Sequence, residues 1–172
     1  IINERGVTEL SNEYDSNNRV VKQTHAVGGA TTFNYTIAGG FVTETSMTAP
    51  NGAVTTWRFN NWKYNTETTT PDGTTTYERD PNTNQILSVT DPLLRKMSYT
   101  YDAKGRTASI TDNAGNVTRY EYEDTYSNVT KITDAVGNIT TMSYDLKGNL
   151  IEIRNPQSAI TNFSYNAIGK PA

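Results

Sequence analysis

The chain has 172 residues, of which 34% are hydrophobic and 19% charged, with a formal net charge of -3 and no cysteine. Thr, Asn and Tyr are abundant while Leu is sparse, a composition that suits exposed, two-sided sheets better than a thick core. A mildly acidic chain has no electrostatic reason to bind nucleic acid or an anionic membrane. No apolar run approaches the length of a membrane span, and the missing cysteines exclude disulfides and thiolate chemistry.

Successive segments of about 21 to 22 residues share one pattern of strand, turn, strand and turn. In the second half, Tyr101, Tyr122, Tyr144 and Tyr165 follow one another at steps of 21, 22 and 21 residues. A fixed period in this range is typical of a repeat architecture, and turns about every ten residues are typical of antiparallel hairpins. We therefore predict one all-β array without a helix signal or linker. Its eight units lie near residues 3–24, 25–45, 46–69, 70–89, 90–110, 111–132, 133–153 and 154–172.

The first four units are degenerate. Asn18 stands where glycine is expected, and asparagine tolerates the left-handed conformation that this position needs. The segment Asn60–Asn65 has the least regular turn sequence. The fourth unit is one residue shorter than the others between Gly73 and Tyr77. Because a slip of one residue would reverse the faces of the strand, we expect a bulge or a local distortion there.

The turns of the later units have Asp at the first of four positions and Gly at the fourth. The Asp side chain accepts hydrogen bonds from backbone N–H groups two residues on, and Gly supplies the positive φ of a type I turn closed by a bulge. These structural turn residues are Asp102, Gly105, Asp112, Gly115, Asp134, Gly137, Asp145 and Gly148. The same carboxylates resemble a calcium-ligand series, but turn chemistry already accounts for their positions, and we predict no metal site.

Aromatic side chains recur at two fixed positions of each unit and are expected to form two stacked rows across the sheet. The members of these rows are Phe33, Tyr35, Trp57, Phe59, Tyr99, Tyr101, Tyr120, Tyr122, Tyr144, Phe163 and Tyr165, with Met142 in an aromatic position. Cross-strand aromatic pairs stabilise sheets, which is the interpretation we favour because the rings follow the repeat instead of gathering at one site. The alternative is a ladder of rings that binds glycans.

The sequence offers no recognisable catalytic group and no cofactor site. The single histidine, His25, lies at a Gly-rich turn without a nucleophile or a second titrating partner that the sequence can identify. We predict that it is a solvated loop residue and that the segment is not an enzyme.

The units resemble the YD repeat, also called the Rhs repeat. The best matches are Tyr101-Asp-Ala-Lys-Gly-Arg106, Thr111-Asp-Asn-Ala-Gly-Asn-Val-Thr118, Thr133-Asp-Ala-Val-Gly-Asn-Ile-Thr140 and Tyr144-Asp-Leu-Lys-Gly-Asn-Leu150. Glu123 and Ser127 depart from the usual Asp and Gly. The resemblance implies a part of a large secreted or cell-surface protein, like bacterial Rhs polymorphic toxins, wall-associated proteins, Tc-toxin shell components or teneurins. Rhs toxins release a C-terminal effector by autoproteolysis at an aspartate-containing motif, which has no match here.

A sheet of about sixteen strands is wider than open sheets usually become without curling, so we expect a coiled, spiralling sheet that is part of a hollow shell. The resulting hypothesis is a non-enzymatic structural segment that encloses or presents an effector domain, with neighbouring repeats and that effector as partners. The alternative is an adhesion module that binds glycans or receptors through the aromatic rows. We also expect the sequence to be an excerpt of a longer repeat protein, whose cut ends would associate through unpaired strands.

Overall fold

The computed structural model describes residues 10–166 and 168–171. Within these residues the chain forms strands, turns and irregular loops, and no helix. The prediction of an all-β fold is therefore confirmed. The strands are β1 (Leu10–Tyr14), β2 (Val20–His25), β3 (Ala30–Ala38), β4 (Phe41–Thr48), β5 (Val54–Phe59), β6 (Asn65–Thr70), β7 (Gly73–Arg79), β8 (Ile86–Thr90), β9 (Lys96–Tyr101), β10 (Thr107–Thr111), β11 (Val117–Tyr122), β12 (Val129–Thr133), β13 (Ile139–Tyr144), β14 (Leu150–Arg154) and β15 (Ile160–Asn162).

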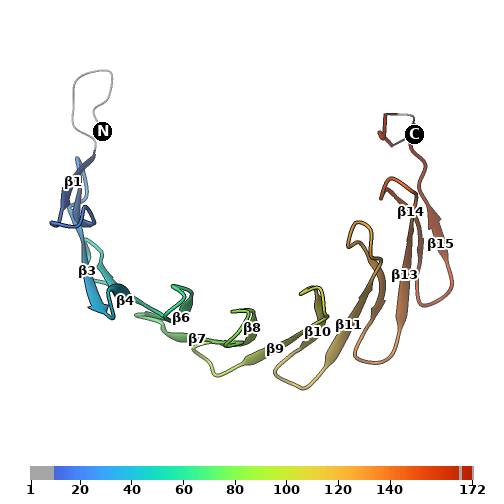
Figure 1. Cartoon of the computed structure of the whole chain (residues 1–172), viewed down its shortest axis with the longest axis horizontal. Helices are drawn as coiled ribbons and strands as arrows, with labels where there is room; N and C mark the ends of the chain where they lie inside the picture. The colour runs from blue at the N-terminus through green and yellow to red at the C-terminus, as the bar shows by residue number, and fades with distance from the viewer. Residues whose placement is uncertain (1–9, 167, 172) are drawn as a thin grey trace. The chain divides into compact units, whose positions relative to one another are not determined.

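The chain divides into two compact units, the first ending at Arg95 and the second beginning at Lys96. The first unit contains β1–β8 and the second contains β9–β15 (Figure 1). Within each unit every strand pairs antiparallel with the next strand in sequence. Successive antiparallel hairpins were predicted from the turn spacing, and this arrangement is confirmed.

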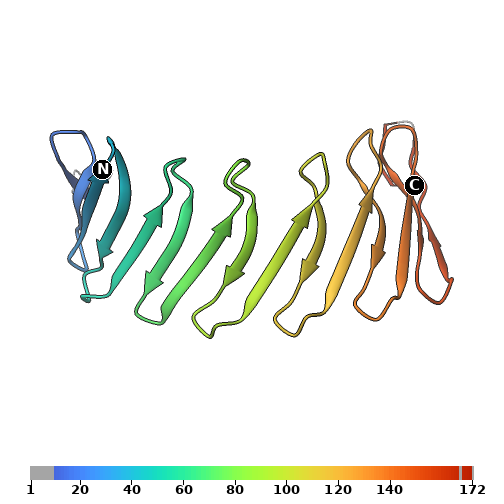
Figure 2. The ribbon, with the colours of Figure 1, turned by 60° about the horizontal axis from the view of Figure 1, so that its bottom comes forward.

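A bulge recurs in the hairpins that an odd-numbered strand forms with the strand after it. In β11–β12, for example, Glu121 pairs with Lys131 and Tyr122 pairs with Val129, so Thr130 is an extra residue on the returning strand. The pairs β10–β11 and β12–β13 have no such shift. Bulges increase local twist. Within each unit, Figure 2 shows twisted turns along the upper edge, where the bulged hairpins close, and open turns along the lower edge.

The shortened fourth unit keeps its register without a bulge at the expected place. Strand β6 pairs with β7 in an unbroken register that ends with Thr70 opposite Gly73, leaving Pro71 and Asp72 as a two-residue turn. The distortion expected between Gly73 and Tyr77 is therefore a wrong prediction. The turn itself absorbs the missing residue, so the faces of β7 are not reversed.

The irregular sequence at Asn60–Asn65 also forms an ordinary turn of this array. The side-chain Oδ1 of Asn60 accepts hydrogen bonds from the backbone N–H groups of Trp62 at 3.0 Å and Tyr64 at 3.1 Å. Lys63 occupies the glycine position with φ of 67°. Asparagine thus replaces aspartate as the turn acceptor, and lysine adopts the left-handed conformation in place of glycine.

Each unit is a single-layer sheet with one aromatic face and one charged face. Side chains of paired residues share a face, so Tyr99 lies beside Ile110 and Tyr120 beside Ile132. Cross-strand ion pairs, such as Lys131 with Glu121 at 2.8 Å, lie on the opposite face. No hydrophobic residue of the described chain is fully buried. The sheet is thus held by its ladder hydrogen bonds and by half-buried contacts, and a closed core is absent from the described residues.

Candidate functional site

The best-defined geometry of the molecule is its repeated turn, represented by Asp102 to Arg106. The Oδ1 atom of Asp102 accepts hydrogen bonds from the backbone N–H groups of Lys104 and Arg106, each at 2.9 Å. The amide of Gly105 donates to the carbonyl of Asp102 at 2.9 Å, and Gly105 has φ of 81°. This is a type I turn closed by a left-handed residue. The other predicted turn pairs, Asp112 with Gly115, Asp134 with Gly137 and Asp145 with Gly148, have the same geometry.

The second carboxylate oxygen of each aspartate is also occupied. Oδ2 of Asp112 accepts a hydrogen bond from Nδ2 of Asn116 at 2.8 Å, while Arg106 donates its Nε proton to Asp102 at 2.7 Å. The hydrogen bond from the Asn116 side chain, followed by that from its backbone, lowers the pKa of Asp112. Hydrogen bonding within the turn therefore uses both oxygens of these carboxylates.

The turn that begins at Glu123 is one residue longer than the aspartate turns, and its carboxylate still accepts hydrogen bonds from backbone N–H groups of the turn. The amide of Glu123 donates to the carbonyl of Asn128 at 3.0 Å, one residue further along than in the aspartate turns. Its longer side chain accepts hydrogen bonds from the backbone N–H groups of Thr125, Tyr126 and Asn128. Ser127 has φ of 61° and stands in the glycine position.

At three places in the described chain, a tyrosine of one hairpin reaches back across the sheet and joins that hairpin to the preceding one. The Oη–H group of Tyr122 donates to the carbonyl oxygen of Thr107 at 2.8 Å, and the guanidinium of Arg106 lies 4.8 Å from the centre of the Tyr122 ring. Partial burial, followed by the negative charge of Asp102, raises the pKa of Tyr122. One side chain thus connects two consecutive hairpins by a hydrogen bond and a cation–π contact.

The same connection occurs at two other hairpin pairs. Tyr35 donates to the carbonyl of Val20 at 2.7 Å beneath the guanidinium of Arg19, and Tyr144 donates to the carbonyl of Val129 at 2.7 Å. These tyrosines belong to the predicted aromatic rows, but their hydroxyl partners were not predicted from the sequence. The signal that could have found them is spacing, because tyrosine follows the turn arginine by sixteen residues in both arginine-containing cases.

The turns along the bulged edge also contact one another. Nζ of Lys104 lies 2.7 Å from Oδ1 of Asp124 in the next turn, and Oη of Tyr126 donates to the carbonyl of Leu146 at 3.0 Å. A Cβ atom at Gly148 would lie 2.9 Å from the Tyr126 ring, which is too close for an unstrained contact. Turn stacking therefore adds a second set of contacts between hairpins.

The predicted aromatic rows occupy odd-numbered strands, with an even-numbered strand between each pair. Adjacent strands are about 4.8 Å apart, so rings two strands apart are separated by roughly 10 Å. Aliphatic side chains such as Ile110 and Ile132 lie between them. The residues of the rows are found in β3 (Phe33, Tyr35), β5 (Trp57, Phe59), β9 (Tyr99, Tyr101), β11 (Tyr120, Tyr122) and β13 (Met142, Tyr144). Phe163 follows β15, and Tyr165 forms an isolated bridge with Pro171.

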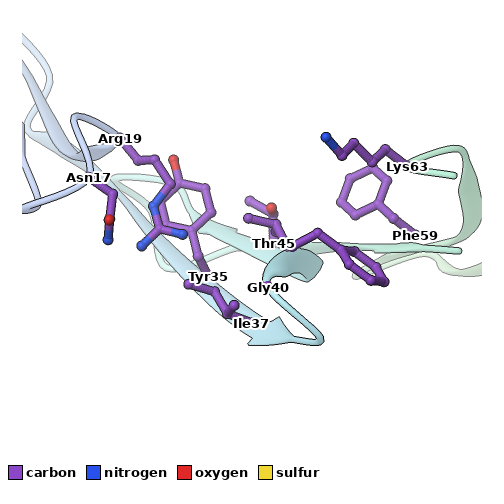
Figure 3. Close-up of a pocket in the computed structure, with 10 residues that line it drawn as sticks. Asn17, Arg19, Tyr35, Ile37, Gly40, Thr45, Phe59 and Lys63 are labelled. Atoms are coloured by element: carbon purple, nitrogen blue, oxygen red, sulfur yellow. The ribbon is translucent and has the colours of Figure 1, made fainter. Parts of the chain in front are cut away.

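The aromatic face of the first unit contains a pocket of about 660 Å³. Figure 3 shows Arg19 stacked on Tyr35 on one side and Lys63 above Phe59 on the other, with the β3–β4 hairpin between them. This pocket was not predicted from the sequence. The departure of its hairpin from the repeat pattern is the feature that could have indicated it.

His25 is exposed at the end of β2, where its backbone amide donates to the carbonyl of Gly29 at 3.2 Å. Among the described residues, no three His, Cys, Asp or Glu side chains are grouped so that they could hold a metal ion. In the same part of the chain, no helix has the length and hydrophobicity needed to cross a membrane.

The repeat pattern agrees with a known family. The RHS Repeat family model matches residues 101–139 and 124–160. Residues 101–160 carry Rhs repeats. The matched segment includes the turns that begin at Asp102, Asp112, Asp134 and Asp145, together with the Tyr122 and Tyr144 connections described above. No protein of curated function matches the chain.

The fold of the chain is also found in solved toxin structures. The crystal structure of TcdB2-TccC3 without its hypervariable C-terminal region has a TM-score of 0.72 at 16% identity, covering 94% of this chain and 10% of that chain. The Tc holotoxin pore of Photorhabdus luminescens has a TM-score of 0.68 at 17% identity, covering 91% and 10%. The chain thus spans about a tenth of the length of these proteins, and at these identities the likeness concerns the fold.

Proposed function

We propose that this Rhs-repeat chain is a non-enzymatic structural segment of a shell or spacer that encloses or presents an effector domain. The observation that carries the proposal is the tyrosine connection between consecutive hairpins, in which Tyr122 bonds to Thr107 and Tyr144 bonds to Val129. These contacts occur at the period of the repeat and so can extend a sheet by further units. The RHS Repeat match and the fold shared with Tc toxin structures support the same role.

The two faces of the sheet favour a wall with an inside and an outside. A single layer leaves its aromatic face half-exposed, and a large exposed apolar surface is unusual unless another surface or an enclosed space covers it. The opposite face carries ion pairs such as Arg58 with Glu44 at 2.9 Å and with Glu67 at 2.7 Å. We therefore orient the aromatic face toward the enclosed volume and the charged face toward solvent.

The partners and the location belong to the same proposal. Neighbouring repeats of the parent protein continue the sheet, and an effector domain of that protein is the enclosed or presented cargo. A large secreted or surface protein is the setting in which such a wall would act. The turn carboxylates are engaged in hydrogen bonds within their own turns, which supports a structural role in place of a catalytic one.

Cysteine labelling tests the orientation, because the chain has no cysteine of its own. Thr55 and Thr56 are consecutive residues of β5, half-buried to a similar degree, and their side chains point to the aromatic and charged faces respectively. In the isolated chain, Thr55→Cys and Thr56→Cys should both react with a maleimide carrying a polyethylene glycol chain. In the full-length parent protein, only Thr56→Cys should react. Equal reaction rates of the two variants in the parent protein would contradict the proposal.

A further inference from the structure

The β3–β4 hairpin lacks the Asp or Asn turn that ends its neighbours, which is built on Asp15 in one and on Asn60 in the other. Strands β3 and β4 are the longest of the described chain, with nine and eight residues, and Ala38 pairs with Phe41 across a two-residue turn. Gly39 and Gly40 form that turn with φ of 59° and 81°. Two consecutive positive φ values are typical of a tight type I′ turn, which continues the direction of the strands instead of folding over the sheet.

The pocket of the first unit occupies the space that this change leaves open. The turn before it contributes Asn17 and Arg19, and the turn after it contributes Lys63. The β3–β4 hairpin forms the floor between these two turns (Figure 3). Further along this edge of the first unit, two consecutive turns contact each other directly, because Nδ2 of Asn60 donates a hydrogen bond to Oδ1 of Asn84 at 2.6 Å. The altered hairpin thus converts one position of the turn stack into a cavity.

The chemistry of the lining is apolar below and cationic at both sides. Tyr35, Phe41 and Phe59 contribute three aromatic rings, and Arg19 and Lys63 contribute two positive charges. The remaining residues of the lining are Asn17, Ile37, Gly40, Val42 and Thr45, so no carboxylate faces the cavity.

The two positively charged side chains of the lining differ in whether a carboxylate of the protein already pairs with them. Arg19 is paired with Asp15 at 2.6 Å and stacks on Tyr35 at 4.8 Å, which holds its guanidinium in place. Lys63 makes no ion pair among the described residues. Its ammonium group is the charge in the lining that a ligand can neutralise without displacing a protein partner.

We propose that this pocket binds a small organic anion with a flat apolar body, of which an aromatic carboxylate is the simplest case. The rings and aliphatic side chains would hold the apolar body, and Lys63 would bind the carboxylate with Arg19 nearby. The volume lies within the range of roughly 300 to 1,000 Å³ that is usual for small-molecule sites. The inference does not depend on the shell role, because it rests on the geometry of one hairpin and its two neighbouring turns.

The second unit contains a pocket whose lining carries negative charges instead of positive ones. A pocket of about 380 Å³ on its aromatic face is lined by Tyr126, Met142 and Tyr144 but also by Glu123 and Asp145. Its carboxylates should repel the anion that the first pocket attracts. Binding driven by aromatic surface alone would not distinguish the two pockets, whereas binding that needs a cation would.

The experiment compares naphthoate with naphthamide, which has a similar shape and no charge. Titration calorimetry on the whole chain gives both affinities, and backbone amide NMR shifts locate the ligand. Naphthoate should bind more tightly and should shift the amides of Gly40 and Thr45. Lys63→Gln should weaken naphthoate about three- to five-fold, the upper part of the range for loss of one solvent-exposed ion pair, and leave naphthamide unchanged. Lys63→Arg should retain most of the naphthoate affinity.

Lys147→Gln is the matched control, since Lys147 is a turn lysine of the second unit that lies outside both pocket linings. It should change neither affinity. Equal binding of the acid and the amide, or unchanged naphthoate binding in Lys63→Gln, would overturn the proposal. Shifts centred on Tyr126 and Leu146 in place of Gly40 and Thr45 would overturn it as well, because they would place the ligand in the second unit.

Discussion

The guanidinium of Arg106 lies 4.8 Å from the ring centre of Tyr122, a residue of the following hairpin. The same arginine donates to Asp102 in its own turn and to the carbonyl of Glu123 in the next turn. Tyr122 completes the arrangement by donating its hydroxyl proton to Thr107, the residue that follows the arginine. Turn geometry within one hairpin and attachment to the next hairpin therefore depend on a single pair of side chains.

Removing one hydroxyl group tests the attachment. Tyr122→Phe should destabilise the chain by about 1 kcal/mol, because a half-buried carbonyl of Thr107 loses its hydrogen-bond donor. Tyr120→Phe is the matched control, two residues away on the same face, since the Tyr120 hydroxyl makes no hydrogen bond within the described chain. Urea denaturation of both variants provides the measurement. The interpretation fails if the two variants lose the same stability.

Replacement of Arg106 by lysine should lower the stability of the chain. Arg106→Lys keeps the charge but loses the planar group that stacks on Tyr122 and bonds to both turns, so a loss of about 1 kcal/mol is expected. Arg95 makes the same ion pair with its turn aspartate, Asp91, and is 64% exposed. Arg95→Lys should therefore cost clearly less in the same denaturation experiment. An equal loss of stability in both variants would mean that the ion pair within the turn, and not the stacking of Arg106 on Tyr122, causes the effect.

The hairpins were predictable from sequence because their determinants are local. Asp102 and Gly105 lie within one turn, and their types alone indicate its hydrogen bonds and its positive φ. The hydroxyl partner of Tyr122 depends on how two consecutive hairpins twist against each other. That twist is set in part by the bulge at Thr130, which carries no sequence signal of its own.

The expected distortion after Gly73 was wrong for a related reason. A one-residue deletion in sequence does not say whether the strand or the turn absorbs it, and here the two-residue turn Pro71-Asp72 does. The pocket beside Phe41 was predictable only in part, because the Gly39-Gly40 turn marks a departure from the repeat but does not say which residues line a cavity. It arises from the absence of a folded-over turn, and its two cations, Arg19 and Lys63, come from different hairpins.

One turn position offers a direct gain in stability. Leu94 has φ of 61° and is 80% exposed, so it bears the left-handed strain without any compensating burial. Leu94→Gly should stabilise the chain by about 1 kcal/mol, the cost of this conformation for a residue with a side chain. The rise in melting temperature gives the result.

Val136 provides the control for that gain, because it is 83% exposed in an equivalent turn and does not have positive φ. Val136→Gly should give no gain and should instead lose up to about 1 kcal/mol through the extra freedom of the unfolded chain. If both glycine variants shift the melting temperature in the same direction, relief of strain at Leu94 is not the cause.

Acid should weaken the array through its turn aspartates. Hydrogen bonds, first from the side chain of Asn116 and then from its backbone, hold the pKa of Asp112 below its ordinary value of 3.8, and Asn138 does the same for Asp134. A carboxyl group with a lowered folded-state pKa binds protons more readily in the unfolded chain. Its stabilisation is therefore complete above the unfolded-state value and is lost as the pH falls through the folded-state value.

The charge can be removed while the turn is retained. Asn155 occupies the same turn position and accepts hydrogen bonds from the amides of Gln157 and Ala159 at 3.0 and 2.8 Å. Asp112→Asn should consequently fold at neutral pH and lose less stability than the unmodified chain when the pH falls from about 7 to about 2. Urea midpoints across that range provide the comparison. An acid response as steep as that of the unmodified chain would show that Asp112 does not contribute to it.

The stacking of successive turns predicts a coupling between Gly148 and Tyr126. A methyl group at Gly148 would meet the Tyr126 ring at 2.9 Å in addition to occupying a conformation with φ of 82°. At Gly115, where φ is 87°, a Cβ atom would have no neighbour within 4 Å. Gly115→Ala should cost about 1 to 2 kcal/mol from the backbone alone, and Gly148→Ala should cost more. In a Tyr126→Ala background the excess at Gly148 should disappear, while the cost at Gly115 should not change. An excess that persists without the tyrosine ring would mean that the two turns do not restrain each other through this contact.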